Sequence, residues 1–183
     1  MRIVGGKFRG RALAGPNTQA IRPTADRLRE SIFNILLHAY GDPITGARVV
    51  DLFAGTGALG LEALSRGAAF ALFVDDGAEA RAIVRQNVQT LGVAGTSRIF
   101  RRDATKLGEV HPNEPFSLAF LDPPYGKGLA EKALASAQAG GWLTSDALIM
   151  VEDAKSAFKA PDGFEEFERR DYDDTEIVFL KLA

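Results

Sequence analysis

The feature that most constrains the fold is a glycine-rich turn between a short apolar run and a helical pattern. Residues 48–53 have the composition of a buried strand, and they are followed by Gly55, Gly57 and Gly60 in the spacing G-x-G-x-x-G. Glycines at this spacing allow a tight turn and a close approach of the backbone to a nucleotide-like ligand. The block therefore predicts a strand–turn–helix unit of a nucleotide-binding sheet.

Apolar runs alternate with amphipathic helical patterns from about residue 47 onward. Strands are predicted at 48–53, 70–74, 98–100, 116–121 and 147–151, and helices up to residue 64, over 80–91 and over 129–139. Such alternation indicates an α/β fold with a mostly parallel sheet covered on both faces. The last two strands, 164–170 and 175–182, are joined by a tight polar turn that permits only an antiparallel hairpin. We expect a Rossmann-like, doubly wound sheet that ends in this hairpin.

Charge is unevenly distributed, although the net charge is only −2. Residues 1–30 carry seven basic and two acidic side chains, a net +5, whereas the remainder carries −7. Lys7, Arg9 and Arg11 alternate in a predicted irregular strand or hairpin, so an extended backbone would place them on one face. A helix is expected to follow from Pro23-Thr24 to about Ala39. The basic segment predicts contact with a polyanion, with a merely solvated surface as the alternative.

Composition excludes several kinds of chemistry. The chain of 183 residues has no cysteine, which excludes disulfides, cysteine-ligated metals and a thiolate nucleophile. Two histidines argue against a histidine triad or a histidine-rich metal site. No apolar run approaches a membrane span, and the opening residues do not resemble a signal peptide. We therefore expect a cytoplasmic, metal-free, monomeric protein that does not bind membranes.

A second motif, Asp122-Pro123-Pro124-Tyr125, follows the predicted strand 116–121. Proline has no N–H, so this run presents hydrogen-bond acceptors and few donors. Asp122 and the Pro123 carbonyl could accept both hydrogens of an exocyclic amine, while Tyr125 offers a flat face for an unstacked base. A rigid turn is the alternative. The position after a strand, behind the glycine turn, favours a role in chemistry.

The cofactor is not fixed by the glycine spacing alone, which suits both NAD and S-adenosylmethionine (SAM). Asp75 and Asp76 end the second predicted strand and could hold ribose hydroxyls. Asp51 lies inside the first strand, where dinucleotide sites usually have apolar residues. An acid at that position favours a cationic ligand such as the sulfonium and amino-acid end of SAM.

Together, the glycine turn and Asp-Pro-Pro-Tyr resemble the SAM-dependent amino-group methyltransferases. The whole chain resembles the bacterial 16S rRNA guanine-N2 methyltransferase family. Three further blocks carry this likeness: residues 2–11 (Arg-Ile-Val-Gly-Gly-Lys-Phe-Arg-Gly-Arg), residues 22–36 (beginning Arg-Pro-Thr-Ala-Asp-Arg) and residues 61–67 (Leu-Glu-Ala-Leu-Ser-Arg-Gly). The chain departs from the family at Asp75, where glutamate is common, and at Tyr172-Asp173, where Tyr-Gly is usual.

The resemblance implies a class I SAM-dependent methyltransferase fold with seven strands in a single domain, 1–183. Residues 1–40 would be a basic hairpin and helix, and residues 41–183 the SAM-binding catalytic core. The implied reaction moves a methyl group from SAM to the exocyclic N2 of a guanine in 16S rRNA, on the small subunit or a late assembly particle. The residues implied in SAM binding are Asp51, Phe53, Ala54, Gly55, Thr56, Gly57, Asp75, Asp76, Asp103 and Ala104.

Two more groups of residues acquire roles from the same resemblance. The guanine would contact Asp122, Pro123, Pro124 and Tyr125. The residues implied in rRNA binding are Lys7, Arg9, Arg11, Arg22, Thr24 and Arg27.

Other functions remain open on the sequence. An amino methyltransferase acting on DNA adenine or protein glutamine would use the same Asp-Pro-Pro-Tyr chemistry. The lack of a target-recognition domain argues against DNA, and the basic segment argues against a protein substrate. From other classes, an NAD-dependent oxidoreductase and a noncatalytic rRNA-binding assembly factor are the alternatives.

Overall fold

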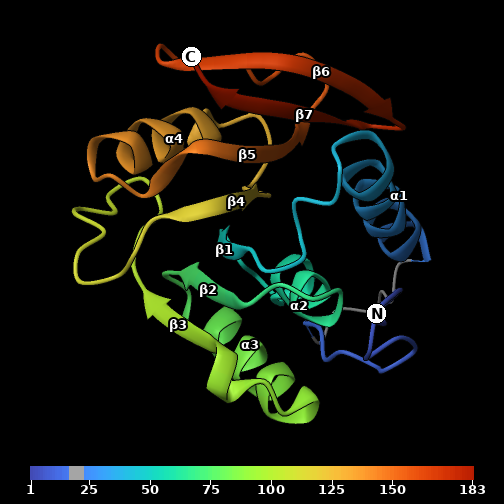
Figure 1. The fold of residues 1–183 in the computed structure, drawn as a ribbon. Coiled ribbons are helices and arrows are strands. Elements are labelled where there is room, and N and C mark those ends of the chain that lie inside the picture. The colour runs from blue at the N-terminus through green and yellow to red at the C-terminus, as the bar shows by residue number, and fades with distance from the viewer. Residues whose placement is uncertain (17–22) are drawn as a thin grey trace.

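A single mixed sheet organises the protein. The computed structural model describes residues 1–16 and 23–183. The sheet has seven strands in the order β3-β2-β1-β4-β5-β7-β6, seen from bottom to top in Figure 1. The strands are β1 (Arg48–Leu52), β2 (Phe70–Asp75), β3 (Ser97–Arg101), β4 (Phe116–Leu121), β5 (Leu143–Ala154), β6 (Phe164–Tyr172) and β7 (Thr175–Leu182).

The helices are α1 (Pro23–Ala39), α2 (Ala58–Ser65), α3 (Ala78–Leu91), α4 (Leu129–Ala139) and the short 3₁₀ turn η1 (Ala94–Thr96). Strands β1 to β5 pair in parallel, and β7 runs antiparallel to both β5 and β6. The predicted fold class is therefore confirmed, including the closing hairpin.

The two faces of the sheet bury separate apolar clusters. One cluster joins α1, α2 and α3 to the strands through side chains such as Phe33, Leu61 and Phe73. The other joins α4 to the opposite face and includes Trp142, whose indole N–H donates to the Gly108 carbonyl at 2.8 Å. Central strands buried on both faces explain why their sequences read as continuous apolar runs rather than as alternation.

The opening segment agrees in part with its prediction. Arg2 and Ala12 form an antiparallel bridge, as expected of an irregular hairpin, but residues 5–10 form turns, so Lys7 and Arg9 do not lie on an extended strand. Gly6 has a φ of 78°, and a Cβ there would lie 2.0 Å from the Ser65 carbonyl oxygen. This close approach to α2 requires glycine, because a side chain would displace the segment.

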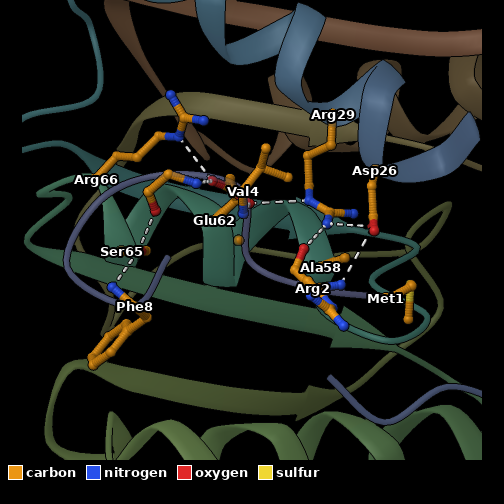
Figure 2. Close-up of polar contacts among 12 residues, drawn as sticks. Met1, Arg2, Val4, Phe8, Asp26, Arg29, Ala58, Glu62, Ser65 and Arg66 are labelled. Atoms are coloured by element: carbon orange, nitrogen blue, oxygen red, sulfur yellow. Dashed lines mark hydrogen bonds and ion pairs between the residues drawn. The ribbon is translucent and has the colours of Figure 1, made fainter. Parts of the chain in front are cut away.

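A buried carboxylate makes several of the contacts that attach the opening segment to the core (Figure 2). Glu62 of α2 accepts the backbone N–H groups of Val4 and Gly5, both at 2.9 Å. It also accepts Arg29 Nε at 3.1 Å and Arg66 Nε at 2.8 Å. We call Glu62 and these four donors the Glu62 cluster. It ties the amino-terminal segment, α1 and α2 together.

Within residues 1–16 and 23–183, no helix is long and apolar enough to cross a membrane.

Candidate active site

The glycine turn after β1 lines a cavity of about 560 Å³ at the carboxyl ends of the parallel strands. Ligands in open α/β sheets bind at this edge, beside the point where strand order reverses. The strand order reverses between β1 and β4. We call this space the first cavity. Its lining residues are Phe53, Gly55, Asp75, Asp76, Asp103, Thr105, Asp122, Pro123, Pro124, Tyr125 and Leu129.

The shape of the glycine turn is held by Asp75 at the end of β2. Its carboxylate accepts the Gly55 N–H at 3.0 Å and the Gly77 N–H at 2.9 Å. Phe53 has a φ of 58°, a left-handed conformation that costs a non-glycine residue energy. Such strain is typical of functional turns, and here it directs the chain from β1 toward the cavity.

Asp51 lies under the turn rather than in the first cavity. Its side chain is buried, and Oδ2 accepts the Gly60 N–H at 3.0 Å, which fixes the start of α2 against β1. Burial, opposed by that hydrogen bond and aided by the charge of Asp75, raises the pKa of Asp51 to about 8.

Asp103 follows β3, and its pKa is shifted in the opposite direction to that of Asp51. Its Oδ1 accepts both the backbone N–H and the hydroxyl of Thr105, at 2.8 and 2.7 Å. These bonds hold the pKa of Asp103 below its ordinary value. Its second oxygen, Oδ2, receives neither Thr105 donor.

The Asp-Pro-Pro-Tyr loop after β4 is fastened to the end of β5. The Tyr125 hydroxyl donates to Glu152 Oε2 at 2.7 Å, and the Gly126 N–H donates to Asp153 Oδ1 at 2.9 Å. Asp122 and Glu152 are thereby kept beside each other. Burial and the neighbouring charges of Glu152 and Asp51 raise the pKa of Asp122 well above its ordinary value, and burial raises that of Glu152.

A second cavity, of about 790 Å³, lies on the other side of Asp122. It is enclosed by α1, the glycine turn, β5 and the β6–β7 turn. Asp122 and Tyr125 line both cavities. The second cavity's other lining residues include Met1, Arg27, Ser31, Thr56, Glu152 and the hairpin residues 172–175.

Several residues predicted in cofactor binding do not line the first cavity. Asp51, Ala54, Gly57 and Ala104 are buried around it, and Thr56 lines the second cavity instead. The turn thus acts mainly through its backbone, so a residue's place in the motif does not determine whether its side chain meets a ligand.

The predicted RNA-binding residues are not gathered at one point. Lys7, Arg9 and Arg11 are exposed, and the Arg11 guanidinium donates to the Thr90 carbonyl at 2.7 Å. Arg27 is exposed and lines the second cavity. Arg22 and the Thr24 side chain lie outside the described residues.

Sequence reasoning missed Glu152, Thr105 and the hairpin turn as parts of the two cavities. Glu152 is the clearest omission, since its signal was an acid inside an otherwise apolar strand (Leu-Ile-Met-Val-Glu-Asp). The same signal had drawn attention to Asp51.

A sheet of this order, with a glycine turn and an Asp-Pro-Pro-Tyr loop at neighbouring strand ends, defines a class I methyltransferase. Solved structures agree with this class. A putative methyltransferase from Escherichia coli superposes with a TM-score of 0.83 at 34% identity, covering 100% of this chain and 98% of that one. A putative methylase from Haemophilus influenzae gives 0.80 at 29% identity, with the same coverage.

Sequence comparisons narrow the class to a family. The chain is 41% identical to ribosomal RNA small subunit methyltransferase D of Escherichia coli K12 over 154 residues, 83% of this chain and 74% of the relative. It is 36% identical to a putative rRNA methyltransferase of Bacillus subtilis over 154 residues, 83% and 82% of the two chains. The family described as "Conserved hypothetical protein 95" matches residues 1–181. The chain belongs to that family.

Proposed function

We propose that this protein transfers a methyl group from SAM to the exocyclic N2 of a guanine in 16S rRNA of the small ribosomal subunit. The observation that carries the proposal is Asp122, which forms a wall common to both cavities. A methyl donor on one side and an amine on the other would meet at its carboxylate. The relatedness to ribosomal RNA small subunit methyltransferase D supports the substrate.

The residues of the first cavity fit SAM. Its volume of about 560 Å³ lies in the usual range for small-molecule sites. Asp75 keeps lone pairs for ribose hydroxyls, although each oxygen already accepts one backbone N–H. Asp103 Oδ2 would accept the adenine amino group, and Phe53 supplies an apolar wall. Asp51 would support the turn from below and lend negative charge near the methionine end.

When bound, SAM supplies an electrophilic methyl group on a positively charged sulfur. The protein's task is then to place a nitrogen in line with it. Asp122 and the Pro123 carbonyl accept the two hydrogens of the guanine amine, so that its lone pair faces the methyl group. Asp122 or solvent would take the proton that the nitrogen loses on methylation. Tyr125 would stack on the base.

The exposed basic residues would hold the RNA backbone. Arg27 lines the second cavity and is the residue best placed to meet a phosphate beside the reacting nucleotide. Lys7, Arg9 and Arg11 would contact phosphates farther away, together with Arg22 and Thr24. We propose a monomer with a single methyltransferase domain as the working unit.

The proposal is tested by nucleoside-resolved methyl transfer. Labelled SAM is incubated with undermodified small subunits, with naked 16S rRNA and with DNA, and the digested products are identified by mass spectrometry. The expected product is N2-methylguanosine from the subunits, lost in Asp122→Ala and retained in the exposed control Glu165→Ala. Label in N6-methyladenine or in protein would overturn the substrate. Binding of SAM without transfer to any substrate would favour an assembly factor.

A further inference from the structure

Glu152 supplies the second cavity with a buried carboxylate beside Asp122. Its side chain is only 7% exposed, and it lines the second cavity but not the first. It therefore lies on the acceptor side of the wall that Asp122 forms. The proposed chemistry gives it no role, since Asp122 and Pro123 already accept both amine hydrogens.

The orientation of Glu152 is fixed. The Tyr125 hydroxyl donates to one of its oxygens, and the adjacent Asp153 accepts the Gly126 N–H, so the loop and β5 form one unit. A base whose amine is held by Asp122 can present to Glu152 the ring position beside that amine on its pairing edge. That position, N1, carries a hydrogen in guanine and none in adenine.

No basic side chain that the structure describes pairs with either carboxyl group. Among the described residues, the ion pairs include neither Asp122 nor Glu152. Buried carboxylates need hydrogen-bond donors, and two of them together demand a ligand that brings several donors. Tyr125 already donates to one Glu152 oxygen, and an apolar or acceptor-rich partner would supply no donor to the remaining oxygens of the pair.

Guanine is the standard base whose pairing edge supplies two adjacent donor groups, N1–H and the N2 amine. Adenine and cytosine each place an acceptor nitrogen next to their amine, and uracil has no amine. A base removed from its stack is read at this edge by hydrogen bonds. Two neighbouring carboxylates thus match guanine and would repel the acceptor nitrogen of adenine or cytosine.

We propose that Glu152 is the specificity-determining residue for guanine, accepting the N1–H while Asp122 and the Pro123 carbonyl hold the N2 amine. This inference rests on the proposed function. Glu152 selects and orients the base, whereas Asp122 binds the reacting nitrogen.

The test changes N1 of the target base from a hydrogen-bond donor to an acceptor. Small subunits are reconstituted with 16S rRNA that carries either guanine or 2-aminopurine at the methylated position found above. The analogue keeps the amine, but its N1 is an acceptor. The wild-type protein should prefer guanine. In Glu152→Gln the amide can donate to N1 of the analogue. Its kcat/KM for guanine should fall about ten- to a hundredfold while that for 2-aminopurine rises.

Controls separate selection from structural support. Glu152→Asp keeps the carboxylate and should retain the guanine preference at a lower rate, and exposed Glu165→Gln should leave the ratio unchanged. Equal losses on both substrates in Glu152→Gln, or an unchanged ratio, would overturn the role of Glu152 while guanine methylation by the wild type stands. A wild-type protein that methylates neither substrate would overturn the proposed function together with this inference.

Discussion

Two acidic sites in this protein have opposite surroundings. Glu62, fully buried in α2, receives two backbone N–H groups and two arginine side chains, drawn in Figure 2. Asp122 and Glu152 are neighbouring carboxyl groups, and among the described residues they receive a tyrosine hydroxyl but form no ion pair. The first site has its charge matched by the protein itself, and the second has not.

This contrast separates stability from function. A buried charge that is matched on every side holds elements together, and breaking it costs several kcal/mol. Neighbouring carboxyl groups with raised pKa values are costly to ionise in the free protein, and such groups cluster at functional sites. The Glu62 cluster therefore serves the fold, whereas the Asp122–Glu152 pair serves the acceptor.

Replacing Asp122 should have the largest effect of all, a loss of activity without a loss of stability. We expect Asp122→Ala to lower methyl transfer about a thousandfold, because the amine loses the acceptor that orients it. The free energy of unfolding should stay equal or rise, since a charge repelled by Glu152 is removed. Single-turnover assays and urea unfolding measure the two quantities. A loss of stability as large as that of a Glu62 variant would contradict the distinction.

Replacing Glu62 should act on stability. Glu62→Gln leaves the buried Arg29 guanidinium without its charge partner in α2, so we expect the free energy of unfolding to fall by about 3 kcal/mol. Urea denaturation at neutral pH measures it. The remaining folded fraction should still bind SAM. A fall below about 1 kcal/mol would mean that Asp26 and the Arg2 carbonyl are sufficient partners for Arg29.

Asp51 lies between the two sites in how well the protein matches its charge. It receives one backbone N–H, and its pKa is about 8. Because the folded chain holds this proton more tightly than the unfolded chain, the free energy of unfolding should fall as pH rises from about 4 to about 8. The contribution is at most about 1.4 kcal/mol per pH unit. Asp51→Asn keeps an acceptor for Gly60 and should flatten this slope. Urea unfolding at about pH 5 and about pH 8 tests it, and parallel slopes in both proteins would refute it.

The smallest effect is expected at the exposed pair of Glu165 and Lys181, whose charged atoms are 3.9 Å apart. Glu165→Gln should change the free energy of unfolding by less than about 0.5 kcal/mol, because water screens the pair. The same urea experiment measures it. A larger loss would show that an exposed ion pair can contribute to the stability of this protein.

Much of the fold could be predicted from local pattern. The bounds of β4, α4 and β7 agree with prediction, because strongly apolar runs end there at turn residues. β5 is longer than its apolar centre, since it begins at Leu143 beside Phe116 of β4. The packing of the opening hairpin on α2 could not be predicted, because the approach of Gly6 to Ser65 is a tertiary contact with no local signature.

Site residues that belong to a sequence motif could be predicted, and residues that only packing brings to the site could not. Asp75, Asp103 and the Asp122 loop line the first cavity as their positions after strands suggested. Arg29 looked like one more cation of the basic segment, yet it is buried against Glu62, a residue 33 positions away. Glu152 acquires its place only because β5 lies next to β4.

The reversed last strand has an evolutionary consequence. Since β7 runs antiparallel to β5, the turn between β6 and β7 reaches the same edge of the sheet as the parallel strand ends, and residues 172–175 line the second cavity. Connecting turns vary more among homologues than the strands that they join. Drift in this one turn could therefore alter which RNA surface is accepted, while the glycine turn and its cofactor chemistry remain untouched.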